Sequence, residues 1–202
     1  MNNRSSVSQS SNFHIFPSEN FIDLCLYQYG HEKCSSGHLF GPATRNHYLF
    51  HYVLSGTGTL MAANSKEENH TYKIHSGQGF MIFPEQITTY IADVQVPWEY
   101  VWVEFDGLRT TEILNICGFS KDAPVYTARS AELRKKLAEE LLYISSHSDQ
   151  SPFHLMGHLY LFFDLLLQSV PSHRPAASSK MSDYYIKESI NFIEQNFQNS
   201  IT

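Results

Sequence analysis

The spacing of apolar residues changes once along this chain, at Gly107, and the change divides it into two kinds of structure. Residues 20–105 read as short apolar or alternating stretches that are separated by glycine-containing turns, such as 55–58 and 76–79. A period of two is typical of β-strands, and glycine tolerates the positive φ angles of tight turns. The stretches predict strands at residues 22–29, 48–54, 59–63, 72–75, 80–83, 88–92 and 98–105. We therefore expect an antiparallel sandwich or barrel over residues 20–107.

Beyond Gly107 the apolar residues repeat at helical spacing. A short helix is predicted at residues 110–117, and a longer one is predicted to begin after Ser130, a suitable N-cap residue. Its apolar residues are Leu133, Leu137, Leu141 and Ile144. A further helix at residues 153–169 follows Pro152. The predicted fold is thus mainly β with α, a barrel followed by a helical pair.

Two adjacent apolar seams run along the helix at 153–169. The first consists of Leu155, Leu159, Phe162 and Leu166, and the second of Met156, Tyr160, Phe163 and Leu167. A stripe this wide needs burial on more than one side, either against the barrel or against another copy of the chain. We predict a homodimer with its interface on the first seam, and assign residues 108–170 as a helical dimerisation region.

The two ends of the chain differ in composition from its centre. Residues 1–19 are predicted to form a flexible N-terminal arm, and the Pro/Ala/Ser-rich residues 171–182 to form a linker. Residues 183–202 predict a new helix with an apolar seam at Ile186, Ile190, Ile193 and Phe197. Because one helix cannot bury such a seam alone, we expect it to open a further module.

Charge and cysteine content bear on partners and location. The formal net charge is −6, and the densest basic cluster is Arg134-Lys135-Lys136. Nucleic-acid binding relies on many phosphate contacts, so we do not expect this chain by itself to bind DNA well. Three cysteines far apart favour reduced thiols, and the polar first ten residues do not read as a signal peptide. These features predict a cytoplasmic protein that does not enter a membrane.

Three stretches in this order resemble the AraC-type transcription regulators. Residues 41–58 look like Arg-x-x-Tyr-x-x-His-Tyr-Val-x-x-Gly-x-Gly, and residues 98–107 look like the family's Trp-x-x-Phe-x-Gly strand. Residues 76–84 are similar to Gly-Asp-x-x-x-x-Pro-Pro, with Gln78 in place of the usual acid. Residues 186–197 are similar to the helix that opens the family's double helix-turn-helix domain.

The resemblance implies a fold and a function. The barrel would be a cupin-like jelly roll that binds a small effector, a mono- or oligosaccharide, for a regulator of carbohydrate-utilisation genes. DNA would be bound only through a C-terminal helix-turn-helix domain, of which residues 183–202 would be the truncated start. No enzymatic activity and no cofactor are implied.

The strand at 98–105 provides the candidate site. Alternate residues share a face, so Tyr100, Trp102 and Glu104 lie together, with Val103 on the opposite face. Sugar sites combine aromatic platforms with a few fixed hydrogen-bond partners. The resemblance selects the same face and adds the position of Tyr90. The predicted ligand-binding residues are Arg45, His51, Tyr90, Tyr100, Trp102 and Glu104; Arg45 would donate a forked pair of hydrogen bonds, and a core role remains the alternative for Trp102 and His51.

The alternative function is a metal-dependent cupin enzyme. Such enzymes hold their metal with His-x-His, a Glu and a later His, but those places fall at residues 43–45, near Leu49 and at 88–89, which offer no such ligands. We therefore predict no catalytic residue and no metal site. A lectin-like binding module is a third interpretation of the sequence.

His154 and His158 lie four residues apart on one predicted helix. They fit either a pair of surface histidines or a pair of metal ligands.

Overall fold

The structure is a computed structural model that describes residues 10–16, 21–170, 186, 189, 190, 192 and 193. The chain divides into two units, Met1–Pro171 and Ser172–Thr202. The elements of the first unit, in chain order, are β1 (Ser10–Ile15), β2 (Cys25–Lys33), β3 (Leu39–Ala43), β4 (Tyr48–Ser55), β5 (Thr57–Ala63), β6 (Asn69–His75), β7 (Gln78–Ile82), β8 (Thr88–Ala92), β9 (Glu99–Asp106), α1 (Thr110–Ile116), β10 (Val125–Thr127), α2 (Ala131–Ser146) and α3 (Pro152–Gln168). Among the described helices, none is long and apolar enough to cross a membrane.

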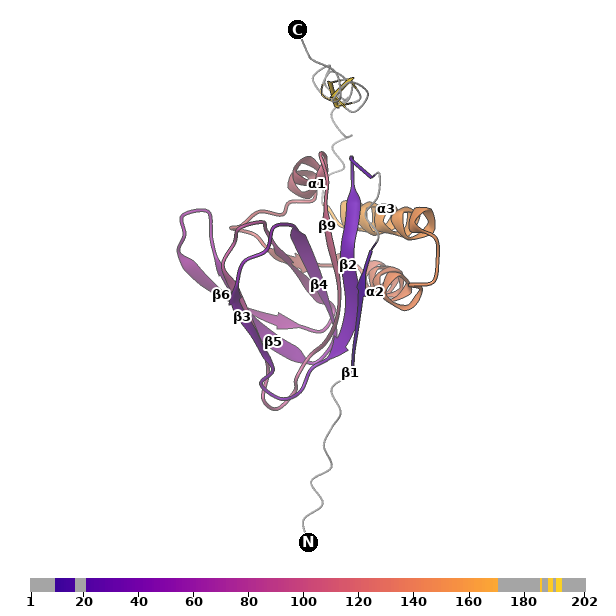
Figure 1. The fold of residues 1–202 in the computed structure, drawn as a ribbon. Coiled ribbons are helices and arrows are strands. Elements are labelled where there is room, and N and C mark those ends of the chain that lie inside the picture. Colours follow the sequence, from indigo (N-terminus) through magenta and orange to yellow (C-terminus); the bar gives the residue numbers. More distant parts are fainter. Residues whose placement is uncertain (1–9, 17–20, 171–185, 187–188, 191, 194–202) are drawn as a thin grey trace. The chain divides into compact units, whose positions relative to one another are not determined.

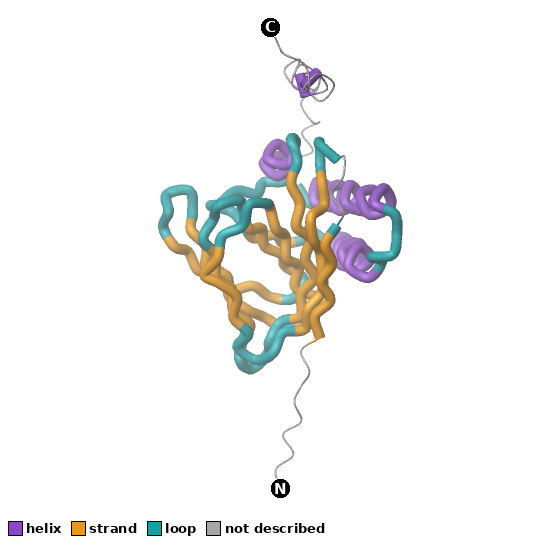
Figure 2. Tube along the Cα trace, viewed as in Figure 1, coloured by secondary structure: helices purple, strands orange, loops and turns teal. Residues whose placement is uncertain are grey.

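Two antiparallel sheets form a barrel. One has six strands in the order β1-β2-β9-β4-β7-β10, and the other has four in the order β3-β8-β5-β6. The sheets face each other, with α2 and α3 outside the six-stranded sheet on the side of β1 and β2 (Figures 1 and 2). The predicted cupin-like jelly roll followed by helices is confirmed.

Strand β9 separates two hydrophobic cores, as its alternation predicted. Val101, Val103 and Phe105 belong to the cluster shared with the helices, whereas Tyr100 and Trp102 belong with the cluster inside the barrel. The six-stranded sheet is therefore covered on both faces. Alternate residues of β9 therefore point in opposite directions, one set toward the helices and the other into the barrel.

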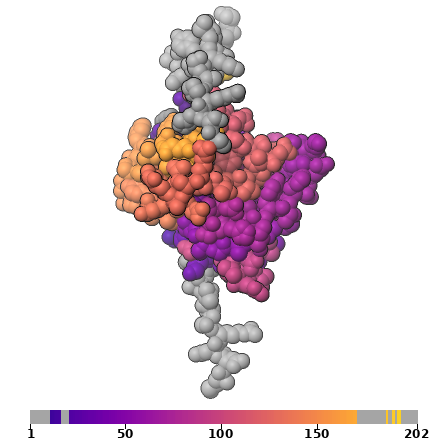
Figure 3. Space-filling model, turned by 180° about the vertical axis from the view of Figure 1, so that it is seen from behind, coloured from indigo at the N-terminus to yellow at the C-terminus, as the bar shows by residue number. Residues whose placement is uncertain are grey.

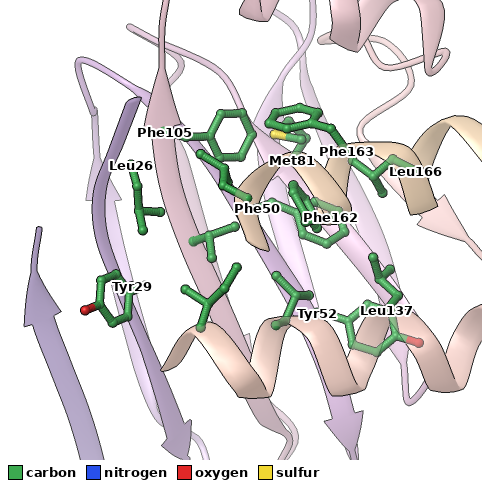
Figure 4. Packing of buried hydrophobic residues seen from close by; sticks show 14 of the residues in the cluster. Leu26, Tyr29, Phe50, Tyr52, Met81, Phe105, Leu137, Phe162, Phe163 and Leu166 are labelled. Carbon is green, nitrogen blue, oxygen red and sulfur yellow. The ribbon is translucent and has the colours of Figure 1, made fainter. Parts of the chain in front are cut away.

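The two long helices begin where their caps predict. The Ser130 hydroxyl accepts a hydrogen bond from the Leu133 amide over 3.1 Å, and Ser151 caps α3 just before Pro152. Aromatic side chains of α3 then pack on the sheet. The Phe162 ring lies 5.3 Å from that of Phe50, between centroids, and is tilted against it by 51°; both residues are labelled in Figure 4.

This packing corrects the predicted dimer interface. Leu155, Leu159, Phe162 and Leu166 are each 2% exposed or less and belong to the core between α3, α2 and the sheet. They are enclosed within one chain, so the prediction that they face a second chain is wrong. The sheet and α2 together cover both seams, apart from such residues as Tyr160, which is exposed. The helical region, in orange, forms one side of the molecular surface (Figure 3).

The predicted domain boundaries also change. Residues 10–15, assigned to a flexible arm, form β1, which pairs with β2 so that Phe13 lies opposite Gly30. Beyond the predicted end of the barrel, β10 pairs with β7. Edge strands gain backbone hydrogen bonds from the sheet, so they need little apolar alternation of their own.

Other predictions fall largely outside the described residues. These are the remainder of the arm at 1–9 and 17–19, and the linker at 171–182. For the helix predicted at 183–202, Ile186, Ser189, Ile190, Phe192 and Ile193 are helical, whereas Phe197 is not among the described residues.

Candidate ligand-binding site

A cavity of about 200 Å³ lies inside the barrel, and both sheets line it. The residues that line it are Phe13, Gln28, Glu32, His38, Phe40, Arg45, His51, Tyr90, Tyr100 and Trp102. Five of the six predicted ligand-binding residues are in this set, and Glu104 is not. The fold thus brings side chains from β4, β8 and β9 around one space.

The strand register places Trp102 in the cavity wall. On β9 it lies opposite His51 of β4 on one side and Gly30 of β2 on the other. A Cβ atom at Gly30 would lie 2.4 Å from the Trp102 ring and 2.2 Å from the Asn12 carbonyl oxygen. Glycine at this position therefore makes room for both the indole and the close approach of β1.

His51 is enclosed by aromatic rings. It stacks on Phe80 at 4.7 Å and meets Tyr100 edge-on at 4.8 Å, both measured between ring centroids. Burial, with a smaller effect from Arg45, lowers the pKa of His51 well below its ordinary value of 6.5. The ring is therefore neutral at physiological pH.

One nitrogen of that neutral ring has no partner. His51 is 2% exposed, and within the described part of the chain its Nδ1 atom makes no hydrogen bond. An unpaired buried polar atom costs about 1–3 kcal/mol. A bound polar ligand can remove this cost, which distinguishes His51 from a satisfied core histidine.

Glu104 lies beside the cavity and holds Arg45. Its Oε2 atom accepts a hydrogen bond from Arg45 Nη1 at 3.2 Å, and its Oε1 atom lies 3.1 Å from Nδ1 of His47. Gln28 Nε2 also donates to Glu104. With these partners and 5% exposure, Glu104 is placed to hold Arg45 in position, and its role as an acceptor for the ligand stays a prediction.

Arg45 connects this carboxylate to the cavity wall. Its guanidinium lies 5.1 Å from the centre of the Phe40 ring. Burial raises the pKa of the nearby Tyr90 hydroxyl to about 12, although Arg45 acts in the opposite direction through charge and a hydrogen bond. The phenol is therefore a neutral donor and acceptor beside a fixed cation.

The sequence analysis missed an acidic group in the cavity wall, Glu32. Tyr100 donates its hydroxyl proton to Glu32 Oε2 over 3.0 Å, and Glu32 Oε1 lies 3.5 Å from His38 Nε2. The strand predicted at 22–29 ends before Glu32, whereas β2 continues to Lys33. Extending the alternation past Gly30 would have found Glu32. Phe13 had no such signal, because only pairing with β2 places it there.

The histidine pair on α3 lies on the outer surface, apart from this cavity. His154 Nε2 is 2.9 Å from the Tyr143 hydroxyl, and His158 Nδ1 pairs with Glu140 of α2. The two histidines make different polar contacts, so the surface reading fits them.

Residues 26–163 match the sequence profile of the AraC-like ligand binding domain. This chain belongs to that family. The match spans β2 to α3 and therefore covers most of the cavity wall of this AraC-like domain.

Two curated proteins are similar to the AraC-like chain over most of its length. It is 27% identical to the Msm operon regulatory protein of Streptococcus mutans over 183 residues, which cover 90% of this chain and 64% of that protein. It is 25% identical to the raffinose operon transcriptional regulatory protein RafR of Pediococcus pentosaceus, over 86% of this chain and 62% of that protein. The chain thus spans less than two thirds of either relative.

Solved structures give weaker matches to this AraC-like domain. An oxalate decarboxylase from Bacillus subtilis superposes with a TM-score of 0.41 and 11% identity, over 63% of this chain and 40% of that one. The protein YhaK from Escherichia coli also gives 0.41, with 13% identity, over 51% of this chain and 46% of that one.

Proposed function

We propose that this domain senses a small saccharide for a transcription regulator of carbohydrate-utilisation genes, and that the saccharide binds in the cavity inside the barrel. The observation that carries this proposal is the unpaired Nδ1 of His51 in an aromatic wall that also holds Arg45. The two relatives support the regulatory part, because both are named as operon regulators and one is named for raffinose.

The cavity wall fits the two surfaces of a sugar ring. Trp102 and Tyr100 offer aromatic faces and edges to C–H groups, while Arg45 and His51 offer fixed polar partners to hydroxyls. A hydroxyl that loses water without gaining a partner costs about 1–3 kcal/mol. The polar residues would therefore select among sugars, and the aromatic residues would supply most of the affinity.

Phe13 offers a route from the ligand to the rest of the regulator. It lines the cavity from β1 and is 53% exposed, so a ligand that contacts it stabilises one position of β1. A ligand shifts a conformational equilibrium only by its difference in affinity for the two states. Signalling would then depend on whether β1 stays paired with β2.

Homodimerisation, a cytoplasmic location and DNA binding through a helix-turn-helix domain complete the proposal. Because the predicted seam is buried within one chain, a second chain would contact exposed apolar residues of α3 such as Tyr160 and Leu161, each 51% exposed. An enzyme of the metal-dependent cupin type is less well supported, because the corresponding positions hold Ala43, Arg45, Leu49 and Thr88.

Isothermal titration calorimetry against a panel of mono- and oligosaccharides tests the proposal. We expect at least one saccharide to bind saturably, with one site per chain. The sugar should be chemically unchanged when it is recovered after incubation. Chemical conversion of the bound sugar would favour an enzyme. Failure of the whole panel to bind would contradict saccharide sensing.

A further inference from the structure

One group of described side chains has the composition of a transition-metal site. Glu32, Cys34 and His38 each bring one ligand atom to within 4.8 Å of the others. Two atoms bound to one zinc ion at about 2.0–2.3 Å each lie no more than about 4.6 Å apart. Small side-chain rotations therefore suffice to bring all three atoms onto one ion.

The local backbone explains why these residues meet. Glu32 lies in β2, and Cys34 follows directly after the end of this strand. Because the two residues are two positions apart in extended chain, their side chains lie on the same face. The chain then turns sharply, with a hydrogen bond from the His38 amide to the Ser35 carbonyl at 3.0 Å and Gly37 at a φ of 67°. This turn brings His38 back beside the two strand residues.

We propose that Glu32, Cys34 and His38 form a binding site for a divalent transition metal of the zinc class. A thiolate, an imidazole and a carboxylate are the ligands that zinc uses in proteins, and three protein ligands leave a fourth position open. The spacing Glu-x-Cys-x-x-x-His differs from the cupin positions, which is why the sequence analysis predicted no metal.

The surroundings of Cys34 suit a metal-bound thiolate. Trp98 is fully buried and its indole N–H has no partner among the described residues. The Cys34 amide donates a hydrogen bond to the Trp98 carbonyl oxygen at 3.1 Å, and both residues belong to the buried cluster inside the barrel. A metal-bound thiolate would give the Trp98 donor an acceptor.

Charge and protons balance on binding. The ion carries two positive charges, and the carboxylate of Glu32 and the thiolate of Cys34 carry one negative charge each. The Cys34 thiol proton passes to solvent, and the His38 imidazole exchanges its contact with Glu32 for the metal. Glu32 and His38 also line the interior cavity, so the open position would face that space.

Titration with Co²⁺ alone tests this site, because cobalt bound to a thiolate gives a charge-transfer absorption band that other ligands do not produce. The reduced, untagged 202-residue chain should develop the band with one equivalent of metal, and Zn²⁺ should remove it. No saccharide is present, so the outcome is independent of the proposed function.

Three variants and two controls locate the metal. Cys34→Ser should abolish the band, and His38→Ala and Glu32→Gln should each weaken binding about 100-fold or more, beyond the 10–100-fold typical of an outer partner. The controls are Cys25→Ser/Cys117→Ser, which leaves Cys34 as the one thiol, and His154→Ala/His158→Ala. Both should keep the band.

Circular dichroism checks that every variant is folded. If the wild type shows no thiolate band, or if the Cys25→Ser/Cys117→Ser variant loses it while folded, the site does not exist as proposed.

Discussion

His51 and Trp102 lie directly opposite each other on β4 and β9, and their rings stack at 6.2 Å between centroids with an angle of 27° between planes. Both side chains line the interior cavity. The ladder register sets this pair, so a change at either residue alters the cavity without altering the strand pairing.

Replacing Trp102 with alanine should weaken saccharide binding about 10-fold or more, because an aromatic platform contributes about 1–3 kcal/mol. Calorimetry measures the affinity. Val103→Ala is the matched control, since Val103 is fully buried on the opposite face of β9 among the helices. It should lower stability by about 1 kcal/mol or more and leave affinity nearly unchanged. Equal affinity for the Trp102 variant and the wild type would place the ligand elsewhere.

Arg45 and Glu104 should act as one unit in binding. Arg45→Ala should weaken saccharide binding about 10-fold or more, since a hydrogen bond from a charged group is worth about 1.5–3 kcal/mol. Glu104→Gln should weaken it less, by letting Arg45 move. If Glu104 acts through Arg45, the double variant should bind as weakly as Arg45→Ala alone. Additive losses in calorimetry would show that Glu104 contacts the ligand itself.

The neutral, buried His51 should make stability depend on pH. Its pKa is below 6.5 in the folded chain, so below about pH 6.5 the unfolded chain binds a proton that the folded chain does not. Stability should therefore fall as pH decreases from 7.5 to 5.5, by up to about 1.4 kcal/mol per pH unit from this group. Urea unfolding at each pH measures the free energy of unfolding of the wild type and of His51→Gln. The decrease of this free energy on acidification should be smaller in the variant. Identical losses would mean that His51 is protonated without cost in the folded chain.

Neighbouring positions on α3 should separate folding from self-association. Leu159 is fully buried, so Leu159→Ala should cost about 2–5 kcal/mol of stability in urea unfolding. Leu161 is half-exposed, and Leu161→Glu should leave the fold intact but weaken the proposed dimer. Sedimentation velocity at tens of micromolar is the measurement. A wild-type chain that sediments as a monomer there would contradict dimerisation through this surface.

Much of the fold could be predicted from the order of short strands and helices, because period and turn chemistry are local properties. The strand predicted at residues 88–92 coincides with β8, and Ser130 caps α2 as expected. Strand parity likewise placed Tyr100 and Trp102 on one face, which β9 confirms. These features depend only on residues that are close together along the sequence.

Pairing between distant segments could not be read in the same way. Phe13 reaches the cavity only because β1 adds to the edge of β2. Glu104 meets Gln28 through the β2–β9 register, and it meets Arg45 and His47 from the loop between β3 and β4. Likewise, the width of the apolar stripe on α3 was visible, but not whether the sheet or a second chain covers it. A sequence determines which face of an element is apolar, whereas the tertiary structure decides which surface buries that face. The reason is that the hydrophobic effect is non-directional, so any apolar surface of matching shape can cover it.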